Sequence, residues 1–410
     1  MEEYDKIEIQ QICSNICSGG TPKSTVAEYY GGNIPWLNTK EINFCRIYKT
    51  EKTITDEGFN NSSAKWIPAN SVIVAMYGAT AGKTAITRIP LTTNQACCNL
   101  TIDSTKADYR FAYYALCNDY AFLSSLANGG AQQNLNTQQI KEFEIPFPSL
   151  REQKRIADIL SSLDDKIELN RRINDNLEQQ AQALFKAWFM DFDPFKDGKF
   201  VNSELGRIPE GWEILCADEI YNINIGKTPP RKESVWFSET EDANIKWISI
   251  SDLANCGTFV GSSSEYLTPQ AINKFNIIVV PSDTVLLSFK LTIGRIAIAK
   301  CSLTTNEAIA RFYLPNPTYR EFTYLTLKNY DYSKLGSTSS IATAVNSKII
   351  KNMKILFPNT KDIEKFHNTV KPIFDTIKSK SDEIDRLCEL RDTLLPRLMS
   401  GELSINTITE

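Results

Sequence analysis

Residues 78–84, with the sequence GATAGKT, are the part of the chain that most resembles a phosphate-binding loop. A P-loop has four residues between its glycines, because successive backbone amides must wrap around a phosphate group. Here only three residues separate Gly78 from Gly82, and the corresponding later stretch, 291–295 (LTIGR), lacks the pattern. We therefore predict that these loops bind no nucleotide.

The chain also lacks the residues that other catalytic chemistries need. Nuclease chemistry needs clustered carboxylates and a lysine around a metal ion. Asp283 and Lys290 could contribute, but Asn70 stands at the position that matches Asp283. The only histidine is His367 and the ten cysteines form no CxxC pair, so no zinc ligand set can be assembled. We see neither the glycine-rich cofactor loop nor the proline-rich tetrapeptide of a methyltransferase, and we predict no catalytic, metal or cofactor site in this chain.

Recognition of a ligand remains as a role for the glycine loops, because glycine lets the backbone approach a ligand closely. Lysine and arginine suit phosphates or guanine edges, while asparagine and glutamine suit adenine edges. The alternative is that these loops are ordinary solvated turns. In the first half of the chain, the candidate DNA-binding residues are Lys23, Asn38, Lys40, Tyr77, Thr80, Lys83, Gln132, Gln133 and Asn134. In the second half, they are Lys227, Arg231, Ser249, Lys290, Thr292, Arg295 and Ser339.

The elements that must position these residues occur twice, with a period of about 210 residues. Four landmarks recur in the same order. They are a glycine turn with a tryptophan strand (19–38 and 226–249), a proline-led β run with a glycine loop (68–83 and 281–295), LTTNQA against LTTNEA (91–96 and 303–308), and a segment that ends in Phe-Pro (136–148 and 346–358). Between landmarks, short strands alternate with turns, which indicates a duplicated mixed α/β domain.

A long helix is predicted after each Phe-Pro. Ser149 with Glu152, and Asn359 with Asp362, have the spacing of capping boxes. Apolar residues then recur every three or four positions: Ile156, Leu160, Leu163, Ile167, Leu177, Ala181, Leu184 and Trp188 in one helix, and Phe366, Val370, Ile373, Ile377, Ile384, Leu387, Leu394 and Leu398 in the other. Each helix of about 40 residues would be up to ~60 Å long. We expect the two to pack antiparallel as a coiled coil; the alternative is that each folds onto its own domain.

Two features interrupt this pattern. Asn170, Asn174 and Lys380 place polar groups in the apolar seam, where a buried polar residue fixes register and pairing at a cost in stability. Pro372 lies inside the second helix and is expected to kink it or to split off its first turns.

The composition limits the classes of protein to which this chain can belong. The 410 residues are 42% hydrophobic and 23% charged, which is typical of folded domains, and no apolar run approaches the ~18–20 residues of a membrane helix. An acidic N-terminus without an apolar stretch predicts no secretory signal, so a cytoplasmic location without a membrane partner is expected. The net charge of −4 counts mildly against nucleic-acid binding but leaves room for a locally basic groove.

Taken together, the chain resembles the specificity subunits of type I restriction-modification systems. The resemblance is carried by 34–37 (IPWL), 72–83, 93–95 (TNQ) and 145–157 (IPFPSLREQKRIA), and extends over essentially the whole chain. The second copy departs from the family pattern in its glycine loop and at 359–363 (NTKDI).

The resemblance implies an α+β architecture with a pseudo-two-fold internal repeat. Two similar mixed α/β target recognition domains, 1–148 and (with a linker) 194–358, would be separated by two long antiparallel helices, 149–193 and 359–410 with the tail. Each domain would read one half of a split, asymmetric target in double-stranded DNA. The helices would set the gap between the half-sites and bind two modification (methyltransferase) subunits, to which restriction (endonuclease and translocase) subunits are added. S-adenosylmethionine, ATP and magnesium would belong to those partners.

Two other functions stay open from the residues alone. One is a coiled-coil scaffold that binds only protein and does not read DNA. The other is a self-sufficient enzyme such as an ATPase, in which turnover would require Lys83.

Overall fold

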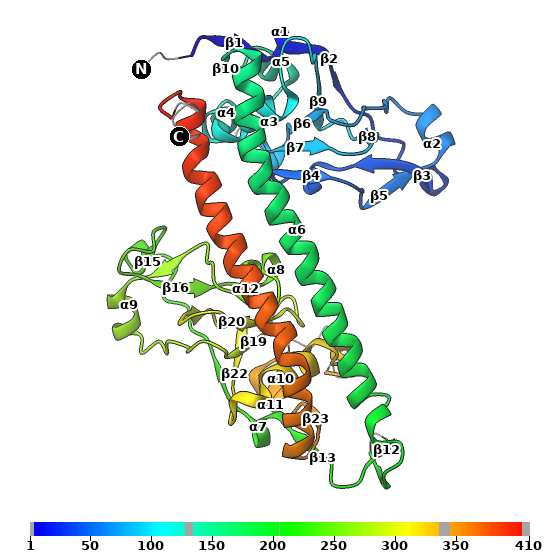
Figure 1. Ribbon diagram of the computed structural model, residues 1–410, viewed down its shortest axis with the longest axis vertical. Coiled ribbons are helices and arrows are strands. Elements are labelled where there is room, and N and C mark those ends of the chain that lie inside the picture. The colour runs from blue at the N-terminus through cyan, green and yellow to red at the C-terminus, as the bar shows by residue number, and fades with distance from the viewer. Residues whose placement is uncertain (1–3, 128–133, 205, 336–344, 404–410) are drawn as a thin grey trace. The chain divides into compact units, whose positions relative to one another are not determined.

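The computed structural model describes residues 4–127, 134–204, 206–335 and 345–403 (Figure 1). The chain forms two compact units. The first comprises Met1–Ile167 together with Arg386–Glu410, and the second comprises Glu168–Asp385. Both boundaries fall inside long helices, so each unit contains one α/β domain and parts of two helices.

The first unit is built on a five-stranded sheet with the order β2-β9-β6-β7-β4. Neighbouring strands are antiparallel except β7 and β4, which are parallel. A second, three-stranded sheet has the order β5-β3-β8, and β1 pairs with β10 near the ends of the domain. The bounds are β1 Lys6–Glu8, β2 Cys13–Ser18, β3 Tyr30–Leu37, β4 Cys45–Ile47, β5 Lys52–Ile54, β6 Val72–Ala75, β7 Thr84–Thr87, β8 Thr92–Thr93, β9 Cys97–Ile102 and β10 Glu144–Pro146.

The second unit repeats this topology. Its five-stranded sheet has the order β14-β22-β19-β20-β17, again with only the last pair parallel. A four-stranded sheet, β15-β18-β16-β21, replaces the three-stranded one, and β13 pairs with β23. The bounds are β13 Glu213–Cys216, β14 Asn222–Ile225, β15 Phe237–Ser238, β16 Ile245–Ile248, β17 Phe259–Val260, β18 Tyr266–Leu267, β19 Val285–Ser288, β20 Ile296–Ala299, β21 Thr304–Thr305, β22 Ile309–Tyr313 and β23 Lys354–Phe357.

Short helices are present in both copies, and α1, α2, α3 and α5 of the first correspond in order to α7, α9, α10 and α11 of the second. In the first unit they are α1 Ile9–Ile12, α2 Asp56–Asn60, α3 Tyr109–Asn118, α4 Tyr120–Ser125 and α5 Thr137–Lys141. In the second they are α7 Ala217–Ile220, α8 Ile250–Asn255, α9 Pro269–Lys274, α10 Arg320–Lys328 and α11 Ser347–Lys351. In the first copy, two helices, α3 and α4, follow one another with only Asp119 between them. Between the copies, the predicted linker contains a hairpin of β11 (Phe200–Ser203) and β12 (Gly206–Pro209).

The central strands of each sheet are buried on both faces. Val72 and Val74 of β6 belong to the core beneath α3, whereas Ile73 belongs to a core on the opposite face. In the second unit, Val285 and Leu286 of β19 divide between two cores in the same way. Side chains alternate across a strand, so a continuous apolar run is what a strand covered on both sides requires.

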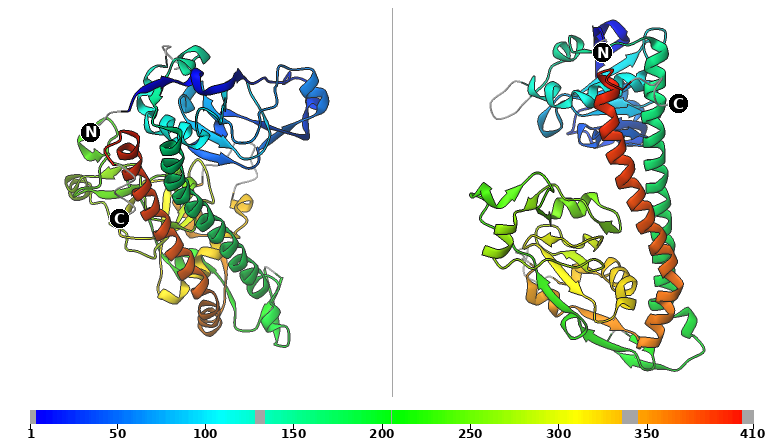
Figure 2. Two further views of the ribbon diagram at one scale, coloured as in Figure 1. Left: turned by 45° about the horizontal axis from the view of Figure 1, so that its top comes forward. Right: turned by 60° about the vertical axis from the view of Figure 1, so that its left-hand side comes forward.

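The two long helices are α6 (Leu150–Phe189) and α12 (Thr360–Met399), each of 40 residues. In the first unit, Ile156 and Leu160 near the start of α6 share a core with Leu398 at the end of α12. In the second unit, the rings of Phe189, at the end of α6, and Phe366, near the start of α12, lie 4.8 Å apart. In each unit the helix segments therefore lie side by side and antiparallel (Figures 1 and 2). The predicted fold of two similar mixed α/β domains with two antiparallel helices is confirmed.

Both helix starts are capped by the predicted residues. The backbone amide of Glu152 donates to Ser149 Oγ over 3.3 Å, while the Glu152 carboxylate accepts from the Tyr4 hydroxyl over 2.9 Å. At α12, the amide of Asp362 donates to Asn359 Oδ1 over 3.0 Å. The bonds to Ser149 Oγ and Asn359 Oδ1 satisfy amides of the first turn that have no partner within the helix.

α12 continues through Pro372 without interruption, so the predicted separation of its first turns is wrong. Proline removes the hydrogen bond that its amide would donate to the carbonyl of Asn368. Both residues are exposed, so water can satisfy that carbonyl.

The polar residues predicted in the apolar seam have different surroundings. Asn170 is fully buried, and neither its side-chain nitrogen nor its oxygen has a hydrogen-bond partner among the described residues. The ammonium of Lys380 instead pairs with Glu383 on its own helix, with 2.8 Å between Nζ and Oε2. Their role in fixing the helix register stays a prediction.

All ten cysteines are free thiols. Burial raises the pKa of Cys98 to about 12, which suits a small core residue. Within the described ranges, no cluster of three or more histidine, cysteine or acidic residues could hold a metal ion. No helix in those ranges is both long and apolar enough to cross a bilayer.

Candidate nucleic-acid interface

The glycine turns that precede the tryptophan strands are held by the same bond in both units. Trp36 Nε1 donates to the carbonyl of Gly20 over 2.9 Å, and Trp247 Nε1 donates to the carbonyl of Lys227 over 3.1 Å. The recurring tryptophan is therefore a scaffold residue that fixes the turn.

The first glycine of each turn permits a close backbone approach. A Cβ atom on Gly19 would lie 2.2 Å from the carbonyl oxygen of Thr93, and one on Gly226 would lie 2.0 Å from that of Asn306. No larger residue fits at such distances. The repeated Thr-Thr-Asn segment is thus the surface against which the turn packs.

Two candidate lysines of these turns differ in their surroundings. Lys23 is exposed and forms no ion pair within the described part of the chain. Lys227 is exposed too, but its ammonium donates to the carbonyls of Phe275 and Asn276 over 3.1 and 3.2 Å. Lys23 is the freer of the two for an external phosphate.

Arg231, the third candidate near these turns, already has an acidic partner. Its guanidinium forms two hydrogen bonds of 2.7 and 2.9 Å with the carboxylate of Glu265. It also stacks 4.5 Å from the ring centroid of Phe237 and 4.4 Å from that of Trp247. A contact with DNA would have to compete with this bidentate pair.

Asn38 and Ser249 occupy matching positions after the tryptophan strands, and both cap a helical turn. The backbone amide of Asn38 donates to Glu41 over 3.0 Å, and that of Ser249 donates to Asp252 over 2.7 Å. Both residues also accept from a backbone amide of the following turn. Lys40, in the first of these turns, is exposed.

The loop between β6 and β7 has a glycine at each of its bends. Gly78 and Gly82 have φ angles of +68° and +83°, which favour glycine. Tyr77 precedes the first bend with 44% of its surface exposed, and Thr80 Oγ1 donates to the Tyr77 carbonyl over 3.3 Å. Lys83, after the second bend, donates from Nζ to Asn43 Oδ1 over 2.8 Å.

The loop between β19 and β20 has a different hydrogen-bond pattern. Ser288 Oγ donates to the carbonyl of Thr292 over 2.6 Å and accepts from the amide of Arg295 over 3.1 Å. Arg295, the counterpart of Lys83, donates from Nη1 to the carbonyl of Ile250 over 2.8 Å. The side chains of Lys290 and Thr292 are exposed.

Leu291, at the tip of this second loop, was not predicted as a site residue. It is fully exposed (101%) and has a φ angle of +61°, whereas Gly78 stands at the matching position of the first loop. A leucine in this conformation carries about 1–2 kcal/mol of strain. The sequence did contain a signal for this residue, because aligning the two loops places an apolar residue where the first loop has a glycine.

Of the four remaining candidates, Asn134 is the one that lies within the described residues. Asn134 is half-buried and forms an isolated antiparallel bridge with Tyr77, so these two candidates are neighbours. Gln132, Gln133 and Ser339 lie outside the described residues.

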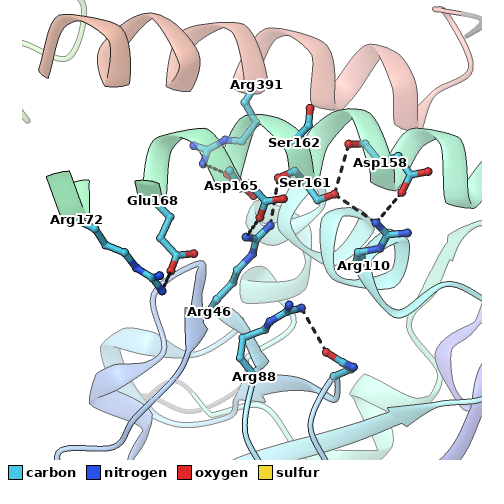
Figure 3. Close-up of polar contacts among 12 residues, drawn as sticks. Arg46, Arg88, Arg110, Asp158, Ser161, Ser162, Asp165, Glu168, Arg172 and Arg391 are labelled. Atoms are coloured by element: carbon cyan, nitrogen blue, oxygen red, sulfur yellow. Dashed lines mark hydrogen bonds and ion pairs between the residues drawn. The ribbon is translucent and has the colours of Figure 1, made fainter. Parts of the chain in front are cut away.

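The structure also brings together charged residues that the sequence reasoning missed, at the junction of the first domain with α6 (Figure 3). Arg46 pairs with Asp165 and donates to the carbonyl of Ser161 over 3.3 Å. Arg110 pairs with Asp158, with 2.7 Å between Nη1 and Oδ1. A signal was present in the sequence, because arginine recurs at the matching position, Arg320, of the second copy.

Comparison with known proteins gives a consistent result for the whole chain. The family model described as "Type I restriction modification DNA specificity domain" matches residues 1–179 and 209–387. The chain is 30% identical over 422 aligned positions to the type I restriction enzyme MjaIX specificity subunit of Methanocaldococcus jannaschii, with coverage of 99% of this chain and 95% of that protein. It is 26% identical over 346 positions to the HindI specificity subunit of Haemophilus influenzae, with coverage of 70% and 74%.

A solved structure shares the fold. The crystal structure of the type I restriction-modification S subunit from M. genitalium superposes with a TM-score of 0.53 at 19% identity, covering 97% of this chain and 96% of that one. The two matches to the family model each contain one copy of the five-stranded sheet. This chain therefore belongs to the family of type I restriction-modification DNA specificity proteins.

Proposed function

We propose that this chain is the subunit that selects the DNA target of a type I restriction-modification complex, with each α/β domain reading one half of a split target. In this role the chain supplies recognition and its partners supply catalysis. The observation that carries the proposal is the repeated sheet, whose strand order is the same in both units while the loops on it differ.

The differences between the loops are of the kind that two readers of unlike sequences need. The loop after β6 presents Tyr77 and Thr80, and the loop after β19 presents Lys290, Leu291 and Thr292. Base edges are distinguished by a few polar and apolar side chains, whereas the frame that carries them adds no sequence information. A shared frame with exchanged contact groups therefore favours different half-sites.

Five of the cationic candidates fall into two groups. Lys23, Lys40 and Lys290 are exposed and form no ion pair with any described residue, so we propose them as phosphate contacts. Lys83 and Arg295 each hold a loop against the segment that follows a tryptophan strand. We propose that these two orient the loops, in addition to any contact with DNA.

We further propose that α6 and α12 set the spacing between the half-sites and bind two methyltransferase subunits, with restriction subunits added for cleavage. Each helix passes from one compact unit into the other, which suits a spacer. S-adenosylmethionine, ATP and magnesium would be bound by those partners. Such a complex acts on cellular DNA, so we propose a cytoplasmic location.

The test is an exchange of one domain in the full chain, assembled with its partners. Residues 1–148 are replaced by the corresponding domain of a relative with another target, and methylated sites are mapped across a genome. One half of the target is expected to change while the other half and the gap stay the same. A change in both halves would contradict modular reading. Absence of sequence-dependent DNA binding in the parent complex would favour a scaffold that binds only protein.

A further inference from the structure

Leu291 combines full exposure with a backbone conformation that few leucines adopt. Seven described residues other than glycine have a positive φ angle, and four of them are asparagine or aspartate, which tolerate it. The other three are Phe44, Phe192 and Leu291. The ring of Phe44 lies 5.0 Å from that of Tyr120, and the ring of Phe192 lies 5.7 Å from that of Trp212, so packing compensates for the strain. Leu291 belongs to none of the hydrophobic clusters of the described residues.

The strain at Leu291 is therefore not offset within the second unit. Single exposed apolar side chains are common on protein surfaces, so exposure alone carries no inference. A glycine at this position, such as Gly78 in the first loop, would relieve the strain without any loss of packing, because the leucine side chain packs against nothing. A contact outside the chain is the role that remains for this side chain.

The loop presents Leu291 at a preformed tip. The backbone amide of Thr292 donates to the carbonyl of Lys290 over 2.6 Å, which closes a three-residue turn around Leu291. Ser288 holds the base of the loop, since its Oγ donates to the carbonyl of Thr292 over 2.6 Å and its own carbonyl accepts from the amide of Gly294 over 3.1 Å. A tip that is already ordered loses little conformational freedom when it binds.

The two neighbours of Leu291 suit the surface of a DNA duplex. Lys290 and Thr292 are both exposed, and Lys290 is proposed above as a phosphate contact. A lysine bound to the DNA backbone would bring the adjacent apolar tip to the groove, where the edges of the bases are exposed. This step rests on the proposed function, in which the second domain reads one half of the target.

Two features of duplex DNA could receive a leucine side chain. One is the C5-methyl group of thymine, which is the apolar group that base edges present in the major groove. The other is the space between two base pairs, which opens only when the pairs unstack and the duplex kinks. The methyl contact needs no distortion of the duplex, so one side chain on a short loop is sufficient for it. The geometry of Leu291 therefore favours the methyl contact.

We propose that Leu291 contacts the C5-methyl group of a thymine in the half-site read by the second domain, and that this contact specifies one A·T pair. It adds to the proposed function a residue and the kind of base that the residue reads. The first domain lacks an equivalent contact at this position, because Gly78 has no side chain.

The test measures the affinity of the full chain, assembled with its partner subunits, for synthetic duplexes that carry the mapped target. Each thymine of the second half-site is replaced in turn by deoxyuridine, which lacks only the methyl group. We expect one such replacement to lower the affinity about fourfold, which is the effect of removing one methyl group from an apolar contact. Leu291→Gly should bind the thymine target about tenfold more weakly and should bind the deoxyuridine duplex equally well.

Three controls separate this contact from other effects. Leu291→Met keeps an apolar side chain and should retain the preference for thymine over deoxyuridine. Val201→Ala, at an exposed apolar position of the linker hairpin, should bind as the parent does. Leu291→Gly should melt within about 2 °C of the parent, so that a loss of affinity is not a loss of folding. It removes no charge, so the slope of log affinity against log salt should stay the same.

Several results would overturn the methyl contact while leaving the proposed function intact. These are a second half-site without any A·T pair, unchanged affinity in Leu291→Gly, and a preference for thymine that persists in that variant. An equal loss of affinity on thymine and deoxyuridine duplexes in Leu291→Gly would indicate a wedge between base pairs instead. A parent complex that binds DNA without any sequence preference would overturn the proposed function, and this contact with it.

Discussion

Arg391 and Asp164 form an ion pair between α12 and α6 across 227 residues of sequence, with 2.8 Å between Nη1 and Oδ1. Burial disfavours the charged arginine, but the hydrogen bond and charge of Asp164 outweigh it and raise the pKa of Arg391 above its usual value. The Tyr114 hydroxyl donates to the second oxygen of the same carboxylate. One aspartate therefore joins both long helices to the first domain.

Removal of this carboxylate should destabilise the first unit. Asp164→Ala leaves Arg391 and the Tyr114 hydroxyl without their shared acceptor, and we expect a loss of about 2–3 kcal/mol. Urea unfolding combined with hydrogen exchange in α3 measures it. Asp392→Ala is the matched control, because that exposed aspartate also contacts Arg391 and should cost less than about 0.5 kcal/mol. Equal losses in the two variants would contradict a special role for Asp164.

Stability of the second unit should depend on pH through Glu178. Burial raises its pKa, but the charge and hydrogen bond of Lys328, with hydrogen bonds from Tyr324 and Thr258, outweigh burial and lower it below 4.5. A lowered folded-state pKa stabilises the fold above the unfolded value, and that stabilisation is lost as pH falls through the folded value.

We therefore expect Glu178→Gln to destabilise the second unit by about 1–2 kcal/mol at pH 7 and to have a smaller effect below pH 4. Urea unfolding of parent and variant across this range, followed by hydrogen exchange in α10, measures the difference. Glu389→Gln, at an exposed helix position, is the control and should leave the pH dependence unchanged. A difference that stays constant from pH 7 to pH 3 would exclude titration of Glu178 as the cause.

The backbone at Gly19 lies so close to Thr93 that any side chain at this position is expected to clash. Gly19→Ala would place a Cβ 2.2 Å from the carbonyl of Thr93, and we expect a loss of about 3 kcal/mol or more in the first unit. At Gly257 a Cβ would meet no atom within 4 Å, so Gly257→Ala should be nearly neutral. Thermal unfolding of the two variants compares them directly, and a well-tolerated Gly19→Ala would contradict the packing described here.

Lys290 should contribute to DNA affinity through charge. If its exposed ammonium contacts a phosphate, Lys290→Ala in the assembled complex should reduce the slope of log affinity against log salt by about one unit. Lys83→Ala should have a smaller effect on this slope, because Lys83 also binds Asn43 within the domain. Lys199→Ala, at an exposed position of the linker, is the control. An unchanged slope for Lys290→Ala would remove this loop from the interface.

The sequence by itself determined the duplication, the two mixed α/β domains and the two long helices. These follow from local patterns, since strand alternation, helix periodicity and capping residues depend on near neighbours in the chain. The antiparallel pairing also followed, because two helices with one apolar stripe each bury those stripes most simply against one another. The loops that carry Lys83 and Lys290 could be placed at strand ends on the same basis.

Only the tertiary structure decided what those side chains contact. In the structure, Asn38 and Ser249 each cap a helical turn. Arg231 pairs with Glu265, and Lys290 is exposed. The tertiary structure also joined Asp164 to Arg391, which no local pattern could pair. The physical reason is that hydrogen bonds and ion pairs are short-ranged and directional, so their partners depend on which distant segments folding brings together within a few ångströms.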